Sequence, residues 1–117
     1  MADLPAVECF PNPVPGRDYV IEHVANEFTS VCPKTGQPDF GVVTIRYVAD
    51  QKCLELKSLK LYLQSFRNRG IFYEAVTNEI LEHLVRDCAP RWMEIETRWS
   101  VRGGMHSVIR ARHGKAP

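Results

Sequence analysis

The chain has 117 residues, of which 44% are hydrophobic and 25% charged, and its formal net charge is +1 at pH 7. This length accommodates one domain with a modest core, and the near-neutral charge gives no bulk electrostatic field for binding DNA or a membrane surface. No apolar run approaches the ~20 residues of a membrane-spanning helix, and the first residues lack the charged and apolar regions of a signal peptide. We therefore expect a cytoplasmic protein.

The cysteines and histidines lack the spacing of metal ligands, so no metal site is expected. The cysteines also lack a CxxC motif or a pairing pattern, which favours reduced thiols over a disulfide framework. They are Cys9, Cys32, Cys53 and Cys88.

The first part of the chain predicts an irregular segment followed by two strands. Residues 1–16 contain four prolines and are expected to form an extended, irregular N-terminal extension, with a single domain at residues 17–117. Residues 17–31 are rich in β-formers and contain no Gly or Pro between 18 and 31, which predicts a strand. In residues 40–49, apolar and polar side chains alternate with the period of a second strand.

The middle of the chain changes to helical spacing. A first helix is indicated by apolar residues on one face: Leu56, Leu59, Leu63 and Phe66. A second, over residues 71–88, carries an apolar residue at every fourth position: Phe72, Val76, Ile80 and Leu84. Ala89-Pro90 is expected to end it.

Two strands close the chain. Residues 91–100 alternate Met93, Ile95, Thr97 and Trp99 with charged residues, which predicts a third strand. Gly103-Gly104 predicts a turn, residues 105–112 a returning strand, and the tail from residue 113 is expected to fray.

This order predicts an α+β fold, ββααββ, with two helices on one face of a four-stranded antiparallel sheet. Such a sheet has two open edges, which a protein must pair or cover. Assembly of several subunits into a continuous barrel would pair them.

The segment from Val31 to Phe40 has the composition of a rigid loop. Two prolines fix φ and lack an N–H donor, and Gly36 tolerates positive φ. Because such a loop doubles back, Cys32 and Asp39 are expected to face the same small volume. A thiol beside a carboxyl indicates a nucleophile with its proton donor, and hence an enzyme.

Two further segments, together with this loop, resemble a known family. Residues 55–62 read Glu-Leu-Lys-Ser-Leu-Lys-Leu-Tyr, and residues 65–74 read Ser-Phe-Arg-Asn-Arg-Gly-Ile-Phe-Tyr-Glu. With the Cys32 loop, they resemble the single-module 7-cyano-7-deazaguanine reductases (QueF), the NADPH-dependent nitrile reductases of queuosine biosynthesis. Residues 55–62 match the family's NADPH motif at every position, and the resemblance extends from Phe10 to Gly104.

The resemblance implies the tunnelling fold (T-fold), whose subunits assemble into barrels with active sites shared between neighbours. It implies reduction of a nitrile to a primary amine with two NADPH, which yields 7-aminomethyl-7-deazaguanine, a precursor of queuosine in tRNA. The expected assembly is a homodecamer of two pentamers. No membrane partner and no direct nucleic-acid binding are expected.

The resemblance also implies residue roles. Cys32 would attack the nitrile carbon to give a covalent thioimide, and Asp39 would protonate the nitrogen. Glu74 would bind the guanine-like ring, with Tyr73 and Phe72 beside it. Many family members have histidine before this glutamate, so Tyr73 is a departure, although tyrosine can still hydrogen-bond or stack on the base.

The cofactor contacts follow from the same motif. Because no GxGxxG motif is present, cationic side chains would hold the NADPH phosphates. The residues expected there are Lys57, Lys60 and Arg102, with Ser58 as a weaker contact. Arg67 and Arg69 could serve phosphate or an intersubunit salt bridge, and Glu55 could support the lysines.

Two other functions stay open from the sequence. An amidinotransferase-like relative would add ammonia to a nitrile already in tRNA, using the same cysteine and aspartate but no NADPH. A non-catalytic ring protein would merely bind a purine-like ligand, and its function would survive loss of Cys32.

Overall fold

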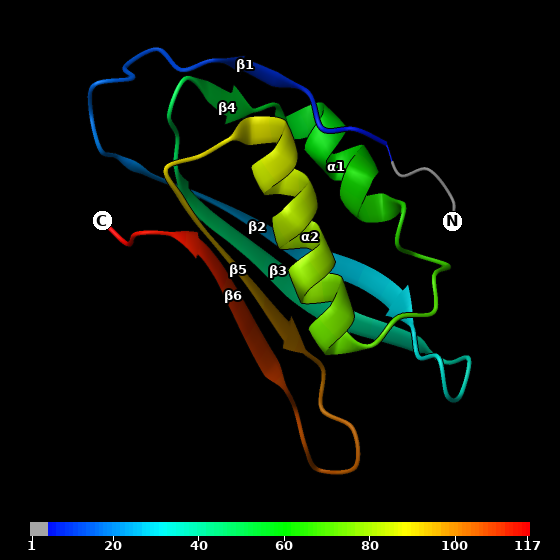
Figure 1. Cartoon of the computed structure of the whole chain (residues 1–117). Helices are drawn as coiled ribbons and strands as arrows, with labels where there is room; N and C mark the ends of the chain where they lie inside the picture. Colours follow the sequence, from blue (N-terminus) through cyan, green and yellow to red (C-terminus); the bar gives the residue numbers. More distant parts are fainter. Residues whose placement is uncertain (1–4) are drawn as a thin grey trace.

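The computed structural model describes residues 5–117 as two antiparallel sheets and two helices (Figure 1). The larger sheet has the strand order β2-β3-β5-β6, and β1 pairs with β4 in a second, two-stranded sheet. Both helices lie on one face of the larger sheet, so the predicted ββααββ arrangement is confirmed. The elements are β1 (Cys9–Pro11), β2 (Val20–Val31), β3 (Pro38–Val48), β4 (Lys52–Leu54), α1 (Leu56–Gln64), α2 (Tyr73–Cys88), β5 (Trp92–Trp99) and β6 (Val108–Gly114).

The core lies between the helices and the larger sheet. The central strands β3 and β5 turn alternate side chains inward, and Ile45 of β3 lies opposite Ile95 of β5. Both are almost completely buried, as are Val76 and Ile80 of α2. Alternate residues of the strands and one face of the helix are therefore buried in the same core, as the sequence predicts.

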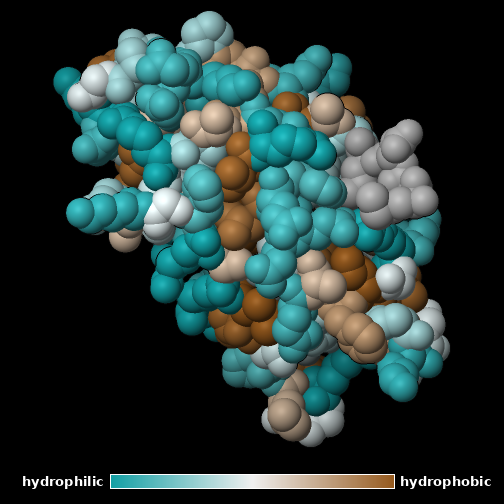
Figure 2. Space-filling model, viewed as in Figure 1, coloured by the Kyte–Doolittle hydropathy of each residue, from teal (hydrophilic) through white to brown (hydrophobic). Residues whose placement is uncertain are grey.

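Two of the predicted helix-face residues are not in this core. Leu56 is 58% exposed because it is the first residue of α1, before the apolar face begins. Phe72 is 53% exposed because it is the N-cap of α2, with an extended backbone (ψ 155°) that takes it off the helical stripe. Figure 2 shows apolar side chains reaching the surface in patches on the helix side.

The N-terminal segment is more regular than expected. Cys9–Pro11 forms β1 and pairs with β4, which the sequence did not indicate, and the Glu55 N–H donates to the Glu8 carbonyl at 2.9 Å. Part of the predicted extension, residues 1–4, lies outside the described residues. The boundary between extension and domain at residue 16 stays a prediction.

The end of the chain is also ordered further than expected. His113 pairs with Met93, so β6 continues to Gly114, and the predicted fraying is wrong for residues 113 and 114. The left-handed Ala89 (φ 48°) before Pro90 ends α2, as predicted. Within residues 5–117, no helix is both long and apolar enough to span a membrane.

The sheet face away from the helices carries one row of alternating charges. Glu22, Arg46, Glu94 and Arg112 are cross-strand partners on β2, β3, β5 and β6. Arg46 pairs with Glu22 at 2.5 Å, and Arg112 pairs with Glu94 at 2.6 Å. These pairs explain how Glu94, a charged residue, can be only 6% exposed.

Candidate active site

The loop between β2 and β3 is closed by its own backbone. The Cys32 N–H donates to the Gln37 carbonyl at 2.8 Å, and the Gly36 N–H donates to the Cys32 carbonyl at 2.9 Å. Gly36 adopts φ +72°, a left-handed conformation that favours glycine. The loop therefore doubles back as predicted and returns the chain to Asp39.

The connection between the helices holds the start of this loop. The Val31 N–H donates to the Arg69 carbonyl, and the Ile71 N–H donates to the Val31 carbonyl, both at 3.0 Å. The Arg69 guanidinium makes a two-pronged ion pair with Glu79 of α2. The Arg69 side chain is therefore engaged by an ion pair within the chain, which is neither the phosphate contact nor the intersubunit salt bridge left open by the sequence.

Cys32 is partly exposed and lies in a local environment that favours its thiolate. A hydrogen bond from the Thr35 hydroxyl and backbone hydrogen bonds from Thr35 and Lys34 lower the pKa of the Cys32 thiol. Burial and the nearby Asp39 charge act in the opposite direction without cancelling this effect. Thr35 was missed by the sequence reasoning, although its place three residues after the cysteine on a tight turn was a usable signal.

We predict that Thr35→Val shifts the reactivity of Cys32 to higher pH. The variant keeps the branched shape but loses the hydroxyl, so the thiol pKa rises and less thiolate is present at a given pH. The rate of alkylation by iodoacetamide, measured against pH, should have its midpoint at higher pH than in the wild type. Thr29→Val serves as the matched control, and equal midpoints in all three proteins would remove Thr35 from the site.

Asp39 is 4% exposed and has two side-chain partners. The Tyr73 hydroxyl donates to Asp39 Oδ1 at 3.3 Å, and Arg102 Nη1 lies 3.5 Å from the same oxygen. Arg102 also donates to the Pro38 carbonyl at 2.6 Å. Within one chain, Arg102 therefore lies beside the carboxyl of Asp39. It does not lie beside Lys57 and Lys60, with which it was expected to hold the NADPH phosphates.

The predicted substrate residues begin α2 at the same end of the sheet. Figure 1 shows the loop after β2, the loop between β5 and β6 and the start of α2 at this end. Glu74 follows Tyr73 in the first turn of α2 and is exposed. Within residues 5–117, its carboxylate has no hydrogen-bond or ion-pair partner. The side chains of Glu74 and Phe72 are therefore exposed and can contact a ligand close to the Asp39–Tyr73 contact.

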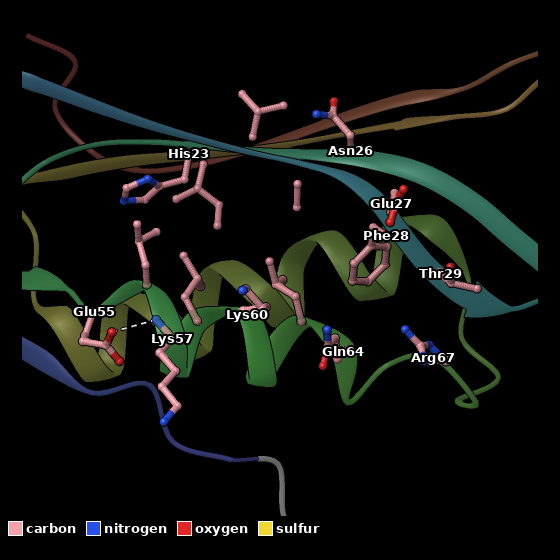
Figure 3. A pocket seen from close by; sticks show the side chains of 16 residues that line it. His23, Asn26, Glu27, Phe28, Thr29, Glu55, Lys57, Lys60, Gln64 and Arg67 are labelled. Atoms are coloured by element: carbon pink, nitrogen blue, oxygen red, sulfur yellow. Dashed lines mark hydrogen bonds between the residues drawn. The ribbon is translucent and has the colours of Figure 1, made fainter.

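The predicted cofactor lysines lie elsewhere in the subunit. A cavity of about 840 Å³ between β2 and α1 is lined by Lys57, Lys60 and Arg67, together with Asn26 and Gln64 (Figure 3). Arg67 has no ion-pair partner within the described part of the chain, in contrast to Arg69. Arg67 is thus the arginine of the two that is available to an anion.

Glu55 and Ser58 organise the start of α1. The Glu55 carboxylate accepts hydrogen bonds from the Lys57 N–H at 2.7 Å and the Ser58 N–H at 2.8 Å, which lowers the pKa of Glu55. The Ser58 hydroxyl accepts from the Glu8 N–H and donates to the Glu55 carbonyl. Glu55 therefore supports the lysines as the helix cap, and the Ser58 hydroxyl is engaged by backbone.

Comparison with solved structures identifies the class of fold. A crystal structure of the archaeosine synthase QueF-Like in the apo form matches with a TM-score of 0.77, over 84% of this chain and 96% of that chain. The sequence identity is 22%, so this likeness concerns the fold. The subunit has the predicted T-fold arrangement.

Comparison of sequences identifies the family. The family model described as QueF-like protein matches residues 38–117. An NADPH-dependent 7-cyano-7-deazaguanine reductase of Anaeromyxobacter sp. (strain K) is 57% identical over 95% of this chain and 91% of its own length. The protein of the same name from Chlorobaculum parvum is 58% identical over 88% of this chain and 89% of its own length. The chain belongs to the QueF-like family, which confirms the resemblance found in the sequence.

Proposed function

We propose that this protein is an NADPH-dependent 7-cyano-7-deazaguanine reductase, which reduces the nitrile to 7-aminomethyl-7-deazaguanine for queuosine biosynthesis. The observation that carries the proposal is the identity of 57% to a reductase of this name over 95% of the chain. The Cys32 loop supports it independently, because it presents an activated thiol near a buried carboxyl. Consumption of two NADPH per 7-cyano-7-deazaguanine, followed by absorbance, tests the proposal.

The chain's own residues account for the first chemical step. The Cys32 thiolate attacks the nitrile carbon, so that an S–C bond forms as one C≡N π bond breaks. Asp39 in its acid form gives a proton to the nitrogen, and the product is a thioimide on Cys32. The proton balance closes if the Cys32 thiol first gives its proton to the Asp39 carboxylate: that proton then passes to the nitrogen, and Asp39 ends the step as the carboxylate.

Glu74 is suited to bind the substrate ring. A guanine-like ring presents a ring N–H and an exocyclic amine side by side, and one carboxylate can accept both hydrogen bonds. The Glu74 carboxylate, which has no partner within residues 5–117, follows Tyr73 in the chain, and the Tyr73 hydroxyl contacts Asp39. Tyr73 and Phe72 complete the proposed substrate site.

Glu74→Ala is predicted to weaken the binding of 7-cyano-7-deazaguanine by about 2–4 kcal/mol, the scale for losing charged hydrogen bonds in a desolvated pocket. Calorimetry should thus show a dissociation constant higher by about thirty- to nine-hundred-fold. Glu82→Ala, on the exposed face of the same helix, should bind as the wild type does. An unchanged constant for Glu74→Ala would exclude this carboxylate from the substrate site.

The cavity beside α1 fits the phosphates of NADPH. Its lining includes three cationic side chains that can pair with phosphate groups, beside the carboxylates of Glu27 and Glu55, and its volume lies within the usual range of ligand pockets. Lys57 and Lys60 would hold the phosphates, with Arg67 beside them, and Arg102 would join them from a neighbouring subunit. When bound, NADPH supplies hydride, and reduction of a nitrile to an amine requires two.

The distance between the two sets of residues supports a shared active site. The cavity with the lysines contains none of the residues around Cys32. Among the described residues, no further strand pairs with the outer edges of β2 and β6 in the larger sheet. Pairing of these edges between subunits would bring one subunit's lysines toward another's cysteine. We propose a homodecamer of two pentamers, and native mass spectrometry should show that mass in preference to a monomer.

The amidinotransferase alternative is less well supported. The structure named for archaeosine synthase shares 22% identity, whereas the relatives named as reductases share more than half of their residues. Unchanged NADPH absorbance, with ammonia incorporated into the nitrile, would favour the alternative. A cytoplasmic location and the absence of direct nucleic-acid binding stay predictions.

A further inference from the structure

The Tyr73 side chain is fixed by a closed circuit of contacts. Its ring stacks on Trp99, with ring centroids 4.1 Å apart and planes 10° from parallel. Trp99 Nε1 donates to Thr97 Oγ1 at 2.9 Å, and this hydroxyl is 2.7 Å from that of Thr77. Thr77 Oγ1 in turn lies 2.7 Å from the carbonyl of Tyr73. The ring and the backbone of Tyr73 are thus tied to each other through β5.

The sheet makes room for this circuit. A Cβ at Gly41 would lie 2.9 Å from Trp99 Cε3 and 3.0 Å from the carbonyl of Arg98, so the indole packs directly against bare backbone. On another side, the Phe28 ring meets Trp99 edge-on at 5.9 Å. Trp99 is 2% exposed and has little freedom to move, and the Tyr73 ring stacked on it is held in place.

At its other end, Tyr73 directs its hydroxyl to the carboxyl of Asp39. Burial, followed by the charge of Asp39 and the hydrogen bond to it, raises the pKa of Tyr73. Arg102 acts in the opposite direction, and Cys32 is the remaining titratable neighbour. The phenol therefore stays protonated at neutral pH and serves Asp39 as a permanent hydrogen-bond donor.

We propose that Tyr73 is a positioning residue, which holds the Asp39 carboxyl in the orientation that delivers the proton to the nitrile nitrogen. This inference rests on the proposed reductase function. It changes the role of Tyr73 from a contact with the base to a support for the acid. It also distinguishes the chain from family members with histidine here, because a phenol adds no titration near neutral pH.

Tyr73→Phe tests the proposal, because it keeps the ring on Trp99 and removes the hydroxyl alone. We expect the thioimide on Cys32, followed by mass spectrometry without NADPH, to form about ten- to a hundred-fold more slowly. The dissociation constant of 7-cyano-7-deazaguanine should change less than about threefold, because the Tyr73 ring is kept and the hydroxyl that is removed is directed to Asp39. Tyr19→Phe is the matched control, since its hydroxyl bonds to Asn12 and should leave the rate unchanged.

Tyr73→His adds a second test with a different readout. Imidazole restores a donor, so adduct formation should recover relative to Tyr73→Phe. Its pH–rate profile should gain a limb at about pH 6.5 that the wild type lacks. The positioning role would be overturned if Tyr73→Phe formed the adduct at the wild-type rate. It would also be overturned if the only defect of this variant were weaker substrate binding.

If the proposed reductase function were wrong, the wild-type protein would neither form the adduct nor oxidise NADPH. In that case, a crystal structure of Tyr73→Phe still decides whether Tyr73 positions Asp39. We expect the Asp39 side chain to adopt another rotamer or to become disordered. An unchanged rotamer contradicts the proposal.

Discussion

Cys32→Ala is expected to lower kcat by on the order of 10⁴-fold or more, because the nucleophile that carries the covalent intermediate is removed. The substrate contacts proposed for Glu74 do not involve the thiol, so the variant should still bind 7-cyano-7-deazaguanine. The measurement is NADPH oxidation under saturating substrate, combined with calorimetry of substrate binding. The expected pattern is binding without turnover.

Cys9→Ala is the matched control for this variant. Cys9 is also a partly buried free thiol, but it lies on β1 and donates to the carbonyl of Asp87, away from the loop. It should keep the wild-type rate. If Cys32→Ala retained full activity, the reaction would not pass through this sulfur, and a ring protein that only binds the base would regain support.

Asp39→Asn is expected to lower kcat by about 10²- to 10⁴-fold, the usual contribution of a general acid. Asparagine keeps the size of the side chain and can still accept a hydrogen bond from the Tyr73 hydroxyl. It has no acidic proton to give to the nitrile nitrogen, and it loses the charge that faces Arg102. Rapid-quench measurement of the thioimide without NADPH isolates the affected step.

The control for this experiment is Asp50→Asn. In the wild type, the Asp50 carboxylate lies in a loop after β3 and accepts a hydrogen bond from Gln51. Thioimide formation in this control should match the wild type. A wild-type rate in Asp39→Asn would show that the proton comes from another group or from solvent. The contacts of Tyr73 and Arg102 with Asp39 would then have no role in this proton transfer.

Most of the fold could be predicted from the sequence because its main elements are amphipathic. The alternation in β3 and β5 and the spacing of Val76, Ile80 and Leu84 reflect direct burial against a single core. The two short strands β1 and β4 could not be found in this way, since three residues are too few to show a period. Leu56 and Phe72 match the helical spacing but lie at helix starts, where the chain has not yet turned toward the core.

The candidate site was predictable only where it is local in sequence. The Cys32 loop is closed by hydrogen bonds between residues 32, 36 and 37, so the prolines and glycine within it carried the signal. The contact of Arg102 with Asp39 joins the β5–β6 loop to the start of β3, and such a tertiary contact leaves no spacing to recognise. The stack of Tyr73 on Trp99 is hidden for the same reason, because alternation marks Trp99 only as a core residue.

The most direct test of the account is the mass of the protein after incubation with 7-cyano-7-deazaguanine in the absence of NADPH. We predict an increase equal to one substrate molecule per subunit, mapped by peptide analysis to Cys32 and absent from Cys32→Ala. If the base is bound, as calorimetry can establish, and the mass stays unchanged, covalent catalysis by Cys32 is contradicted.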